Sequence, residues 1–235
     1  MPTAVAVRHG AHRALGLTED GESWAQAAAR MGGGRPAYAV DLTGEVKEFT
    51  GDAWPVVALR PMTPGDLPSL VRWLSQEHVR RWFGVDGPPT PERVADRYAA
   101  DIAGETATTM WVVETNGRSV GFCQDYRVGD YPDYALLTPD PEAIGVDYAI
   151  GEPAFVGRGL GTRMLWTWLL GVEARYPGAR TCFAAPDHRN AASLRVLDKV
   201  GFARGTWFDE PQPDGTVSTV VGCTLDLKRV VGAGA

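Results

Sequence analysis

One segment of this 235-residue chain constrains its fold more than any other, and it reads Gly157-Arg158-Gly159-Leu160-Gly161-Thr162. Closely spaced glycines let the backbone approach a ligand without interference from Cβ atoms. The apolar residues that follow predict a largely buried helix over residues 157–175, and residues 144–150 before the loop predict a strand. Because the start of a helix presents free N–H groups and the positive end of its dipole, we expect an anion to bind here.

Spacing excludes two common phosphate-binding loops. A dinucleotide fingerprint that began at Gly157 would need a glycine where Thr162 stands. A P-loop would need Gly-Lys-Ser or Gly-Lys-Thr at the helix start, and the sequence has no such triplet. The segment therefore predicts an anion site of another kind, with a tight turn before a packed helix as the alternative.

Composition narrows the class of protein. Apolar residues make up 44% of the chain and charged residues 22%, which is typical of a globular protein and excludes wholesale disorder. The net charge of −6 argues against a nucleic-acid partner, which normally requires a basic surface. The same acidic balance allows a cationic small molecule as substrate.

Targeting and cysteine usage predict a cytoplasmic protein. Charged and histidine residues between positions 8 and 13 interrupt any signal-peptide core, and the longest apolar run, residues 164–172, is too short to cross a bilayer. We therefore expect no membrane association. Three widely spaced cysteines in predicted strands are expected to be reduced core thiols, with neither a disulfide nor a metal site: Cys123, Cys182 and Cys223.

The order of predicted elements indicates a mixed α/β fold. Residues 1–55 lack a long amphipathic pattern and are interpreted as an N-terminal extension, while residues 56–230 form the main domain. Several hairpins, one of them at Asn116-Gly117, favour a mostly antiparallel sheet with helices on both faces. Strands are expected at 56–60, 110–114, 119–126, 144–150, 180–185 and around Asp214-Gly215, and helices at 67–74, 79–83, 90–103, 157–175 and 190–200.

Three motifs together resemble the acyl-CoA site of the GNAT N-acetyltransferase superfamily. They are the glycine loop, Asn190-Ala191-Ala192-Ser193 and Lys199-Val200-Gly201-Phe202. The resemblance implies the GNAT fold, a splayed mixed sheet that admits CoA between two central strands, and acetyl-CoA as the acyl donor. It also implies backbone contacts to the CoA pyrophosphate and a contact from Asn190 to the pantetheine. The implied cofactor-binding residues are Val156, Gly157, Arg158, Gly159, Leu160, Gly161, Thr162 and Asn190.

Within that superfamily the chain is most similar to aminoglycoside 6'-N-acetyltransferases. The resemblance covers residues 138–147, where an acidic loop leads into a Gly-Val-Asp strand, and residues 66–82, which include Trp82. It implies that Asp147 is the catalytic base or the anchor of the substrate amine. By implication the acceptor is a primary amine of an aminoglycoside, the 6'-amine being favoured, and the role is antibiotic resistance.

The residues themselves agree with a cationic acceptor. Between positions 130 and 147 the chain has five acidic residues and neither Lys nor Arg, and two tyrosines supply flat faces for sugar rings or cations. The alternative is a solvated acidic loop. The candidate substrate-binding residues are Trp82, Asp130, Tyr131, Asp133, Tyr134, Asp140, Glu142 and Asp187.

Two departures from the related enzymes keep other functions open. Leu197 stands where those enzymes often carry a tyrosine that protonates the leaving thiolate. Ala185 stands where they carry a substrate-binding aspartate, and Asp187, two residues later, could take over that role. Residues 186–190 also resemble siderophore-pathway lysine N-acyltransferases, although those usually carry His at the position of Asp147. A CoA-binding module without turnover is a further alternative. We expect His188 to be a local hydrogen-bond partner rather than a catalyst. We expect the protein to be a monomer or a homodimer.

Overall fold

A computed structural model describes residues 3–9, 12–17, 37–41, 46–47, 57–83, 87–115, 117–132, 140–211 and 215–227. Its main feature is a seven-stranded sheet in the order β10-β11-β9-β8-β7-β6-β5. Neighbouring strands run antiparallel except β8 and β9, which are parallel. The strands are β5 (Val57–Pro61), β6 (Thr109–Thr115), β7 (Arg118–Arg127), β8 (Ile144–Ile150), β9 (Thr181–Ala184), β10 (Ala203–Pro211) and β11 (Val217–Asp226).

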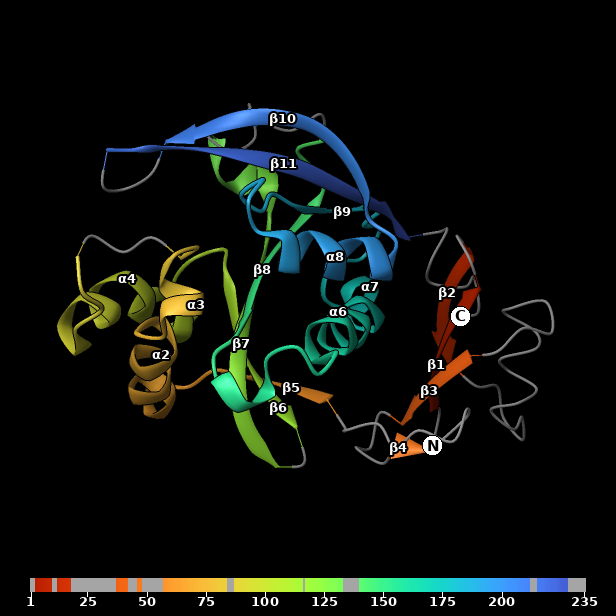
Figure 1. Ribbon diagram of the computed structural model, residues 1–235, viewed down its shortest axis with the longest axis horizontal. Helices are drawn as coiled ribbons and strands as arrows, with labels where there is room; N and C mark the ends of the chain where they lie inside the picture. Colours follow the sequence, from red (N-terminus) through yellow and green to blue (C-terminus); the bar gives the residue numbers. More distant parts are fainter. Residues whose placement is uncertain are drawn as a thin grey trace.

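Helices cover both faces of this sheet, as expected from the sequence (Figure 1). One face carries α2 (Leu67–Leu74), α3 (Glu77–Arg80) and α4 (Pro91–Ala103). The other carries α6 (Leu160–Leu170), α7 (Val172–Arg175) and α8 (Ala191–Val200). Short 3-10 turns join some elements, namely η1 (Pro64–Asp66), η2 (Val128–Asp130) and η3 (Pro153–Phe155).

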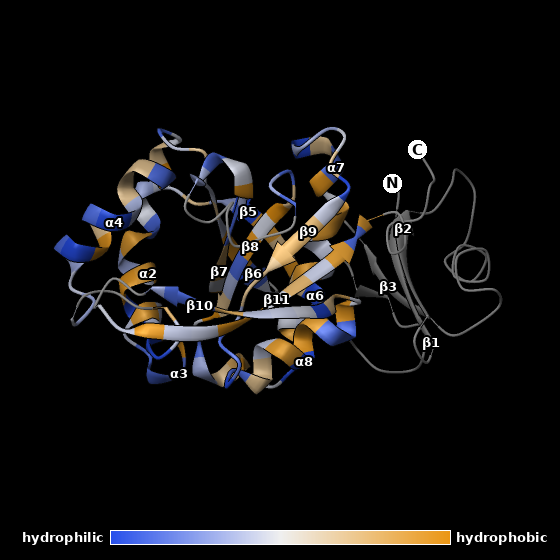
Figure 2. Ribbon diagram, turned by 90° about the horizontal axis from the view of Figure 1, so that it is seen from above, coloured by the Kyte–Doolittle hydropathy of each residue, from blue (hydrophilic) through white to orange (hydrophobic). Residues whose placement is uncertain are grey.

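The alternation of side chains along the strands divides the core into two layers. On β7, Phe122 packs with α2, α3 and α4, whereas its neighbour Cys123 packs with α6 and α8. Val112 and Val113 on β6 are divided in the same way. Figure 2 shows the resulting apolar residues on the strands and on the inward-facing parts of the helices. This division fixes which residues of β8 face each helical layer.

The first helical segment begins at the capping box that the sequence predicts. The Thr63 backbone N–H donates to the Asp66 carboxylate at 2.9 Å, and Pro64 occupies the first turn. Arg60 also pairs with Asp66 at 2.7 Å and, as the largest influence, holds the pKa of that carboxyl well below its usual range. The segment is thereby tied to strand β5.

The helix expected over residues 157–175 is shorter in the structure. Gly157 and Gly159 have φ values of +78° and +76°, which are left-handed and unsuited to a right-handed helix. Residues 157–159 therefore form a loop, and α6 begins at Leu160 and ends at Leu170. Gly171 separates it from the single turn of α7, so one predicted helix becomes two.

A second, four-stranded antiparallel sheet lies within the N-terminal stretch, where the sequence predicted an extension and no particular strands. It contains β1 (Thr3–His9), β2 (His12–Leu17), β3 (Ala37–Asp41) and β4 (Val46–Lys47), in the order β2-β1-β3-β4. Strand β2 approaches α6, on the side of the molecule away from α2 and α4 (Figure 1). The boundary at residue 55 stays a prediction.

All three cysteines lie in the core, as the sequence predicts: they are buried on β7, β9 and β11. Burial raises the pKa of Cys223 to about 11, which keeps it a thiol. Among the described residues, no three His, Cys, Asp or Glu side chains gather as metal ligands. None of the helices in the described ranges combines the length and apolar character needed to cross a membrane.

Candidate active site

The site begins where the two parallel strands separate. Strands β8 and β9 are paired at Ile144 with Cys182 and at Gly145 with Phe183. β8 continues to Ile150, and in this described region no further pair joins it to β9. The strands diverge from that point (Figure 1), so β9 does not pair with residues 146–150 of β8, and the Ile150 carbonyl bonds His78 instead. The splayed sheet expected from the sequence is therefore present.

Asp147 lies on the open part of β8. It pairs in register with Gln124 of β7, and the Gln124 side-chain Nε2 donates a hydrogen bond of 3.0 Å to the Asp147 Oδ2. Asp147 is half-buried. Burial raises its pKa, and hydrogen bonds from Gln124 and Tyr126 oppose this rise only in part. A carboxylate with a raised pKa on the part of β8 that β9 does not pair suits the role of a general base.

The glycine loop follows directly from β8 through η3. Residues 156–159 are exposed, so their backbone is accessible to a ligand in front of α6. Leu160 and Thr162 point into the core instead, which restricts their contribution to backbone N–H groups. At Gly161 a Cβ would lie 3.3 Å from Val196 Cγ2, so a small residue is needed where α6 packs on α8.

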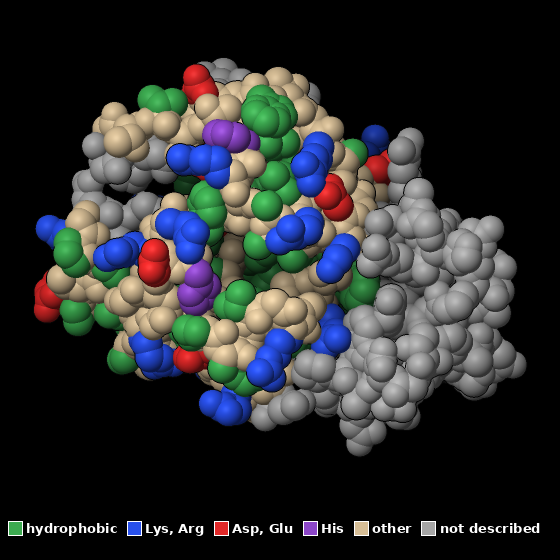
Figure 3. All heavy atoms as spheres, in the orientation of Figure 1, with side chains coloured by type: hydrophobic (Ala, Val, Ile, Leu, Met, Phe, Trp, Pro, Cys, Tyr) green, Lys and Arg blue, Asp and Glu red, His purple; other side chains and the backbone are tan. Residues whose placement is uncertain are grey.

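The molecular surface is hollowed on the face drawn in Figure 3, with Lys and Arg side chains around the hollow. Arg158 of the glycine loop and Arg195 of α8 are both exposed. They belong to the two segments that pack together at Gly161. On a chain with a net charge of −6, such cations favour an anionic ligand at this face.

The strand end that leads into the glycine loop is held by α2 and α3. The Trp73 Nε1 and the Arg72 guanidinium both donate to Glu152 Oε1, at 2.9 and 2.8 Å. Gly151 lies so close to Trp73 that an added Cβ would come within 2.2 Å of the indole. One residue earlier, the Ile150 carbonyl accepts from His78 Nε2 at 2.9 Å. These contacts fix the direction in which the chain leaves β8.

We expect Glu152→Ala to raise the KM for acetyl-CoA about tenfold with little change in kcat, because the loop loses its support while Asp147 stays in place. Glu152→Gln retains an acceptor for Trp73 and should recover part of the loss. Steady-state kinetics with varied acetyl-CoA measure the effect. Asp66→Asn disturbs a comparable ion pair, the one with Arg60, and serves as the matched control. An equal rise in KM for both variants would show a general effect of lower stability.

Asn190 forms the N-cap of α8. Its Oδ1 accepts a hydrogen bond of 3.1 Å from the Ser193 backbone N–H. The side-chain oxygen is therefore engaged within the protein, and its amide N–H₂ group is the part left to contact a pantetheine. The predicted role of Asn190 is compatible with this geometry and stays a prediction.

The predicted substrate-binding residues are dispersed. Asp133 and Tyr134 lie outside the described residues. Asp130 is exposed at the end of η2, and Trp82 is half-buried with the Arg81 guanidinium 5.6 Å from its ring. Tyr131 packs edge-on against Tyr126 at 5.3 Å, and its hydroxyl forms a hydrogen bond with Thr108 Oγ1. Tyr126 also hydrogen-bonds the Asp147 carboxylate, so Tyr131 contacts the site through Tyr126.

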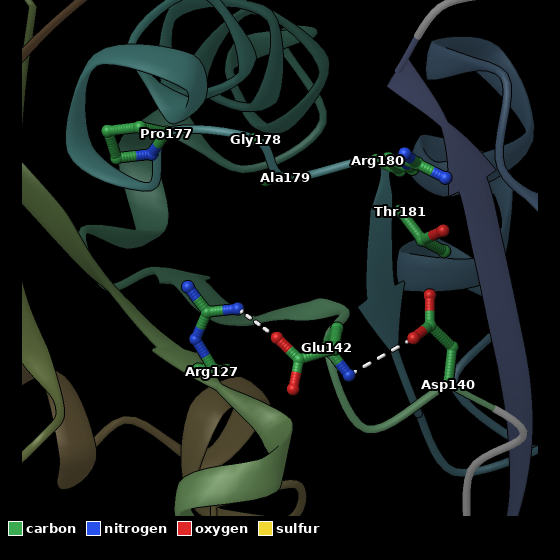
Figure 4. A pocket seen from close by; sticks show the side chains of 8 residues that line it. All are labelled: Arg127, Asp140, Glu142, Pro177, Gly178, Ala179, Arg180 and Thr181. Carbon is green, nitrogen blue, oxygen red and sulfur yellow. Dashed lines mark hydrogen bonds and ion pairs between the residues drawn. The ribbon is translucent and has the colours of Figure 1, made fainter.

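Asp140 and Glu142 line a different pocket of about 560 Å³, shown in Figure 4. Glu142 forms an ion pair of 2.6 Å with Arg127, and Asp140 Oδ1 accepts from the Glu142 backbone N–H at 3.0 Å. Arg127 is three residues beyond Gln124 on β7, so strand alternation places it on the opposite face from Gln124 and Asp147. The structure thus does not bring these two acids to Asp147.

Asp187 is also engaged with neighbouring cations. Arg189 forms an ion pair of 2.7 Å with it, and this contact is the main reason that the pKa of Asp187 is lowered. His188 hydrogen-bonds the Thr219 carbonyl at 3.0 Å, which is the local role that the sequence suggests.

Sequence reasoning missed Gln124, which hydrogen-bonds Asp147. The two residues lie on strands joined by a long segment, residues 128–143, so their register could not be derived from a turn type. The Gln124 Oε1 is buried and has no partner among the described residues. This carbonyl oxygen is a second acceptor beside the carboxylate.

We expect Gln124→Leu to raise the pKa of Asp147 further, because the hydrogen bond from Gln124 favours the ionised carboxylate. The acid limb of kcat/KM against pH should then move to higher pH, so that the loss relative to wild type is larger at pH 6 than at pH 8. Tyr126→Phe removes the other hydrogen bond and should shift the limb in the same direction. A limb that stays in place would contradict the assignment of this titration to Asp147.

The fold and site together define an acetyltransferase of the GNAT class. A family model described as the acetyltransferase (GNAT) domain matches residues 63–210. That match spans more than half of the chain, which therefore belongs to the GNAT acetyltransferase family. The fold and the enzyme class expected from the sequence, an N-acetyltransferase, are confirmed.

Individual relatives fall into two groups. Aminoglycoside N(6')-acetyltransferase type 1 from Klebsiella pneumoniae is 28% identical over 168 residues, which are 71% of this chain and 79% of that protein. Lysine N-acyltransferase MbtK from Mycobacterium sp. (strain MCS) is 28% identical over 172 residues, 71% of this chain and 69% of the relative. The crystal structure of aminoglycoside acetyltransferase AAC(6')-Ib in complex with coenzyme A matches with a TM-score of 0.63 at 26% identity, covering 74% of this chain and 96% of that one.

Proposed function

We propose that the protein transfers the acetyl group of acetyl-CoA to a primary amine of an aminoglycoside, with the 6'-amine favoured, and thereby confers resistance. The observation that carries the proposal is the position of Asp147 on the part of β8 that β9 does not pair, on the strand that leads through η3 into the glycine loop. The similarity to the Klebsiella pneumoniae enzyme over 71% of the chain supports the substrate class. A cytoplasmic location is part of the proposal.

The chain's own residues account for the chemistry of this transfer. An amine arrives protonated and must lose a proton before it attacks the thioester carbonyl. Asp147 orients the ammonium group and accepts that proton, directly or through a water, and the Gln124 Oε1 offers a second acceptor. The N–C bond then forms, the C–S bond breaks, and its electron pair leaves on sulfur. Backbone N–H groups on the unpaired edge of β8 stabilise the oxyanion of the intermediate.

A lysine-type amine is the second candidate acceptor, favoured by a specific observation. Two of the acids assigned to a polycation are already paired with arginines: Asp187 with Arg189 at 2.7 Å and Glu142 with Arg127 at 2.6 Å. Fewer carboxylates are then available for a polycation than the sequence suggests. The MbtK relative, a lysine N-acyltransferase, is consistent with this alternative.

The test is thiol release from acetyl-CoA with purified protein against kanamycin, tobramycin, analogues blocked at the 6'-amine, lysine and polyamines. Turnover confined to free 6'-amines is the expected result. Turnover with lysine, improved by longer acyl-CoA donors, would instead support the second candidate. Binding of CoA without any transfer would indicate a module that lacks catalysis.

The resistance role needs a cellular measurement. Expression in a susceptible bacterium should raise the kanamycin concentration that inhibits growth, and the Asp147→Asn variant at equal abundance should not. Equal protection by both proteins would argue against acetylation at this site as the cause.

A further inference from the structure

Helix α4 lies on the same side of the sheet as the Asp147 carboxylate, together with α2 (Figure 1). Its buried Tyr98 packs in one cluster with Phe122 of β7 and Ala149 of β8, which are paired with each other in register. These two residues share a face with Gln124 and Asp147, because each lies two positions away along its strand. The Tyr98 side chain is therefore beside the pair that is proposed to hold the amine.

Arg97, which precedes Tyr98 on α4, places a guanidinium at this part of the sheet. Its guanidinium carbon lies 5.4 Å from the centre of the Tyr98 ring. Burial raises the pKa of both Asp147 and Tyr98, and the charge of Arg97 lowers both. The charges of Arg97 and Asp147 therefore act on each other. Arg97 is exposed, so a molecule that binds from solvent can reach it.

This arrangement limits the charge that an acceptor can carry near its reacting amine. With one ammonium group at Asp147, a second ammonium group on the same sugar or chain would be repelled by Arg97. A hydroxyl or a carboxylate would instead accept a hydrogen bond, because a guanidinium has N–H donors and no acceptor. Two acids that could offset the repulsion, Glu142 and Asp187, are paired with other arginines.

We propose that Arg97 is a specificity-determining residue, which selects acceptors that carry a hydroxyl or a carboxylate, rather than a second ammonium group, close to the reacting amine. In an aminoglycoside this group is a hydroxyl of the sugar that bears the 6'-amine, and the other ammonium groups point away from α4. In a lysine-type acceptor it is the α-carboxylate. The inference rests on the proposed transfer beside Asp147 but not on which of the two acceptors is used.

Two pairs of acceptors test this selection. Kanamycin A and kanamycin B differ only by a hydroxyl or an amine on the sugar that bears the 6'-amine, and lysine differs from cadaverine only by its carboxylate. In the pair that the enzyme acetylates, wild-type kcat/KM should be about tenfold higher for kanamycin A or for lysine, and Arg97→Gln should reduce this preference to less than about threefold. Because both members of a pair have the same reacting amine, a change at Asp147 itself cancels in the ratio.

The matched control is Arg93→Gln, which makes the same change one turn earlier on α4, where the guanidinium lies against Gly87. This variant should keep the wild-type preference. A preference that is unchanged in Arg97→Gln, or that both variants lose equally, overturns the proposal. In the wild type the preference should also weaken with added salt, because the Arg97 charge is exposed.

A binding measurement separates this inference from the proposed function. Calorimetric titration of the CoA-bound protein with the same four compounds gives their dissociation constants without any transfer. A wild-type preference in binding that Arg97→Gln loses supports the role of Arg97 even where no acetyl group is transferred. Transfer to the 6'-amine with equal preference in the wild type and Arg97→Gln would support the proposed function and overturn the role of Arg97. Failure of all four compounds to bind would overturn both.

Discussion

The Asp147→Asn variant is expected to show a kcat about 10²- to 10⁴-fold below wild type, the usual effect of removing a positioned general base. The substitution keeps the shape of the side chain and an oxygen that can accept from Gln124 Nε2. The loss would therefore report on proton acceptance rather than on packing. Thiol release with a saturating acceptor measures it, and Asp101→Asn on α4 is a control with the same chemical change. A near-normal kcat would remove Asp147 from the mechanism.

The pH dependence provides a second signature of this residue. Asp147 accepts a proton only in its ionised form, so the wild-type kcat/KM should fall as the pH drops through its raised pKa. The Asn variant should lack that acid limb. A limb that persists in the variant would belong to another group.

The contribution of Asp147 to folding stability should change with pH in the direction opposite to its contribution to activity. The pKa of Asp147 is higher in the folded protein than the value of about 3.9 in an unfolded chain, so the native state binds this proton more tightly. Stability then falls as the pH rises from the unfolded through the folded pKa. At neutral pH the wild type carries that cost and Asp147→Asn does not. Its urea midpoint should equal or exceed the wild-type value, which would exclude unfolding as the cause of lost activity.

The second large effect concerns Asp125, the neighbour of Gln124 on the other face of β7. Its carboxylate is completely buried and accepts from Trp168 Nε1 at 2.7 Å and from the Tyr176 hydroxyl at 3.0 Å. Arg175 lies 3.0 Å from Oδ2, with its guanidinium 4.9 Å from the ring of Trp111. One carboxylate thus joins β7 to both α6 and α7.

Asp125→Ala should lower the free energy of unfolding by about 3–5 kcal/mol, because removal of one partner leaves a half-buried guanidinium without its counter-charge, and leaves the buried Trp168 N–H and the half-buried Tyr176 hydroxyl without an acceptor. Urea denaturation followed by tryptophan fluorescence measures this change. Asp125→Asn retains an acceptor for Trp168, so its free energy of unfolding should lie between those of the wild type and Asp125→Ala.

An exposed ion pair provides the comparison. Arg204 and Asp198 are 2.6 Å apart, yet their side chains are 47% and 44% exposed. Asp198→Ala should therefore cost less than about 1 kcal/mol. Equal losses for Asp125→Ala and Asp198→Ala would mean that the buried carboxylate contributes no more than a solvated one.

Local sequence patterns determined several elements of the fold well. The capping box at Thr63 and the Pro at the next position suffice to place a helical start, since both act within one turn. The strands around residues 116–117 pair at Thr115 with Arg118, the two-residue hairpin that Asn-Gly favours. The helix after the glycine loop was predicted to start three residues early, because spacing does not reveal that Gly157 and Gly159 have positive φ.

Contacts between distant segments could not be predicted. The acids of residues 130–147 form one cluster in the sequence, but strand alternation and Arg127 place Glu142 on the face opposite Asp147. Asp187 and Arg189 are only two residues apart, so their ion pair could have been predicted from the sequence. That this pair makes the Asp187 carboxylate less available to a cationic substrate is evident only from the folded geometry. Gln124 became a candidate only when the register of β8 against β7 was known.

The contacts around Glu152 have a consequence for how the two substrates influence each other. Trp73 and Arg72 belong to the helical layer on the Asp147 side of the sheet, while Glu152 leads into the glycine loop, which is the proposed CoA site. An amine acceptor bound against α2 would restrain Glu152 through these hydrogen bonds and, with it, the start of the loop, so each substrate is expected to raise the affinity for the other. Such linkage is reciprocal: the factor by which the amine improves CoA affinity equals the factor by which CoA improves amine affinity. The two substrates are therefore expected to bind with positive cooperativity.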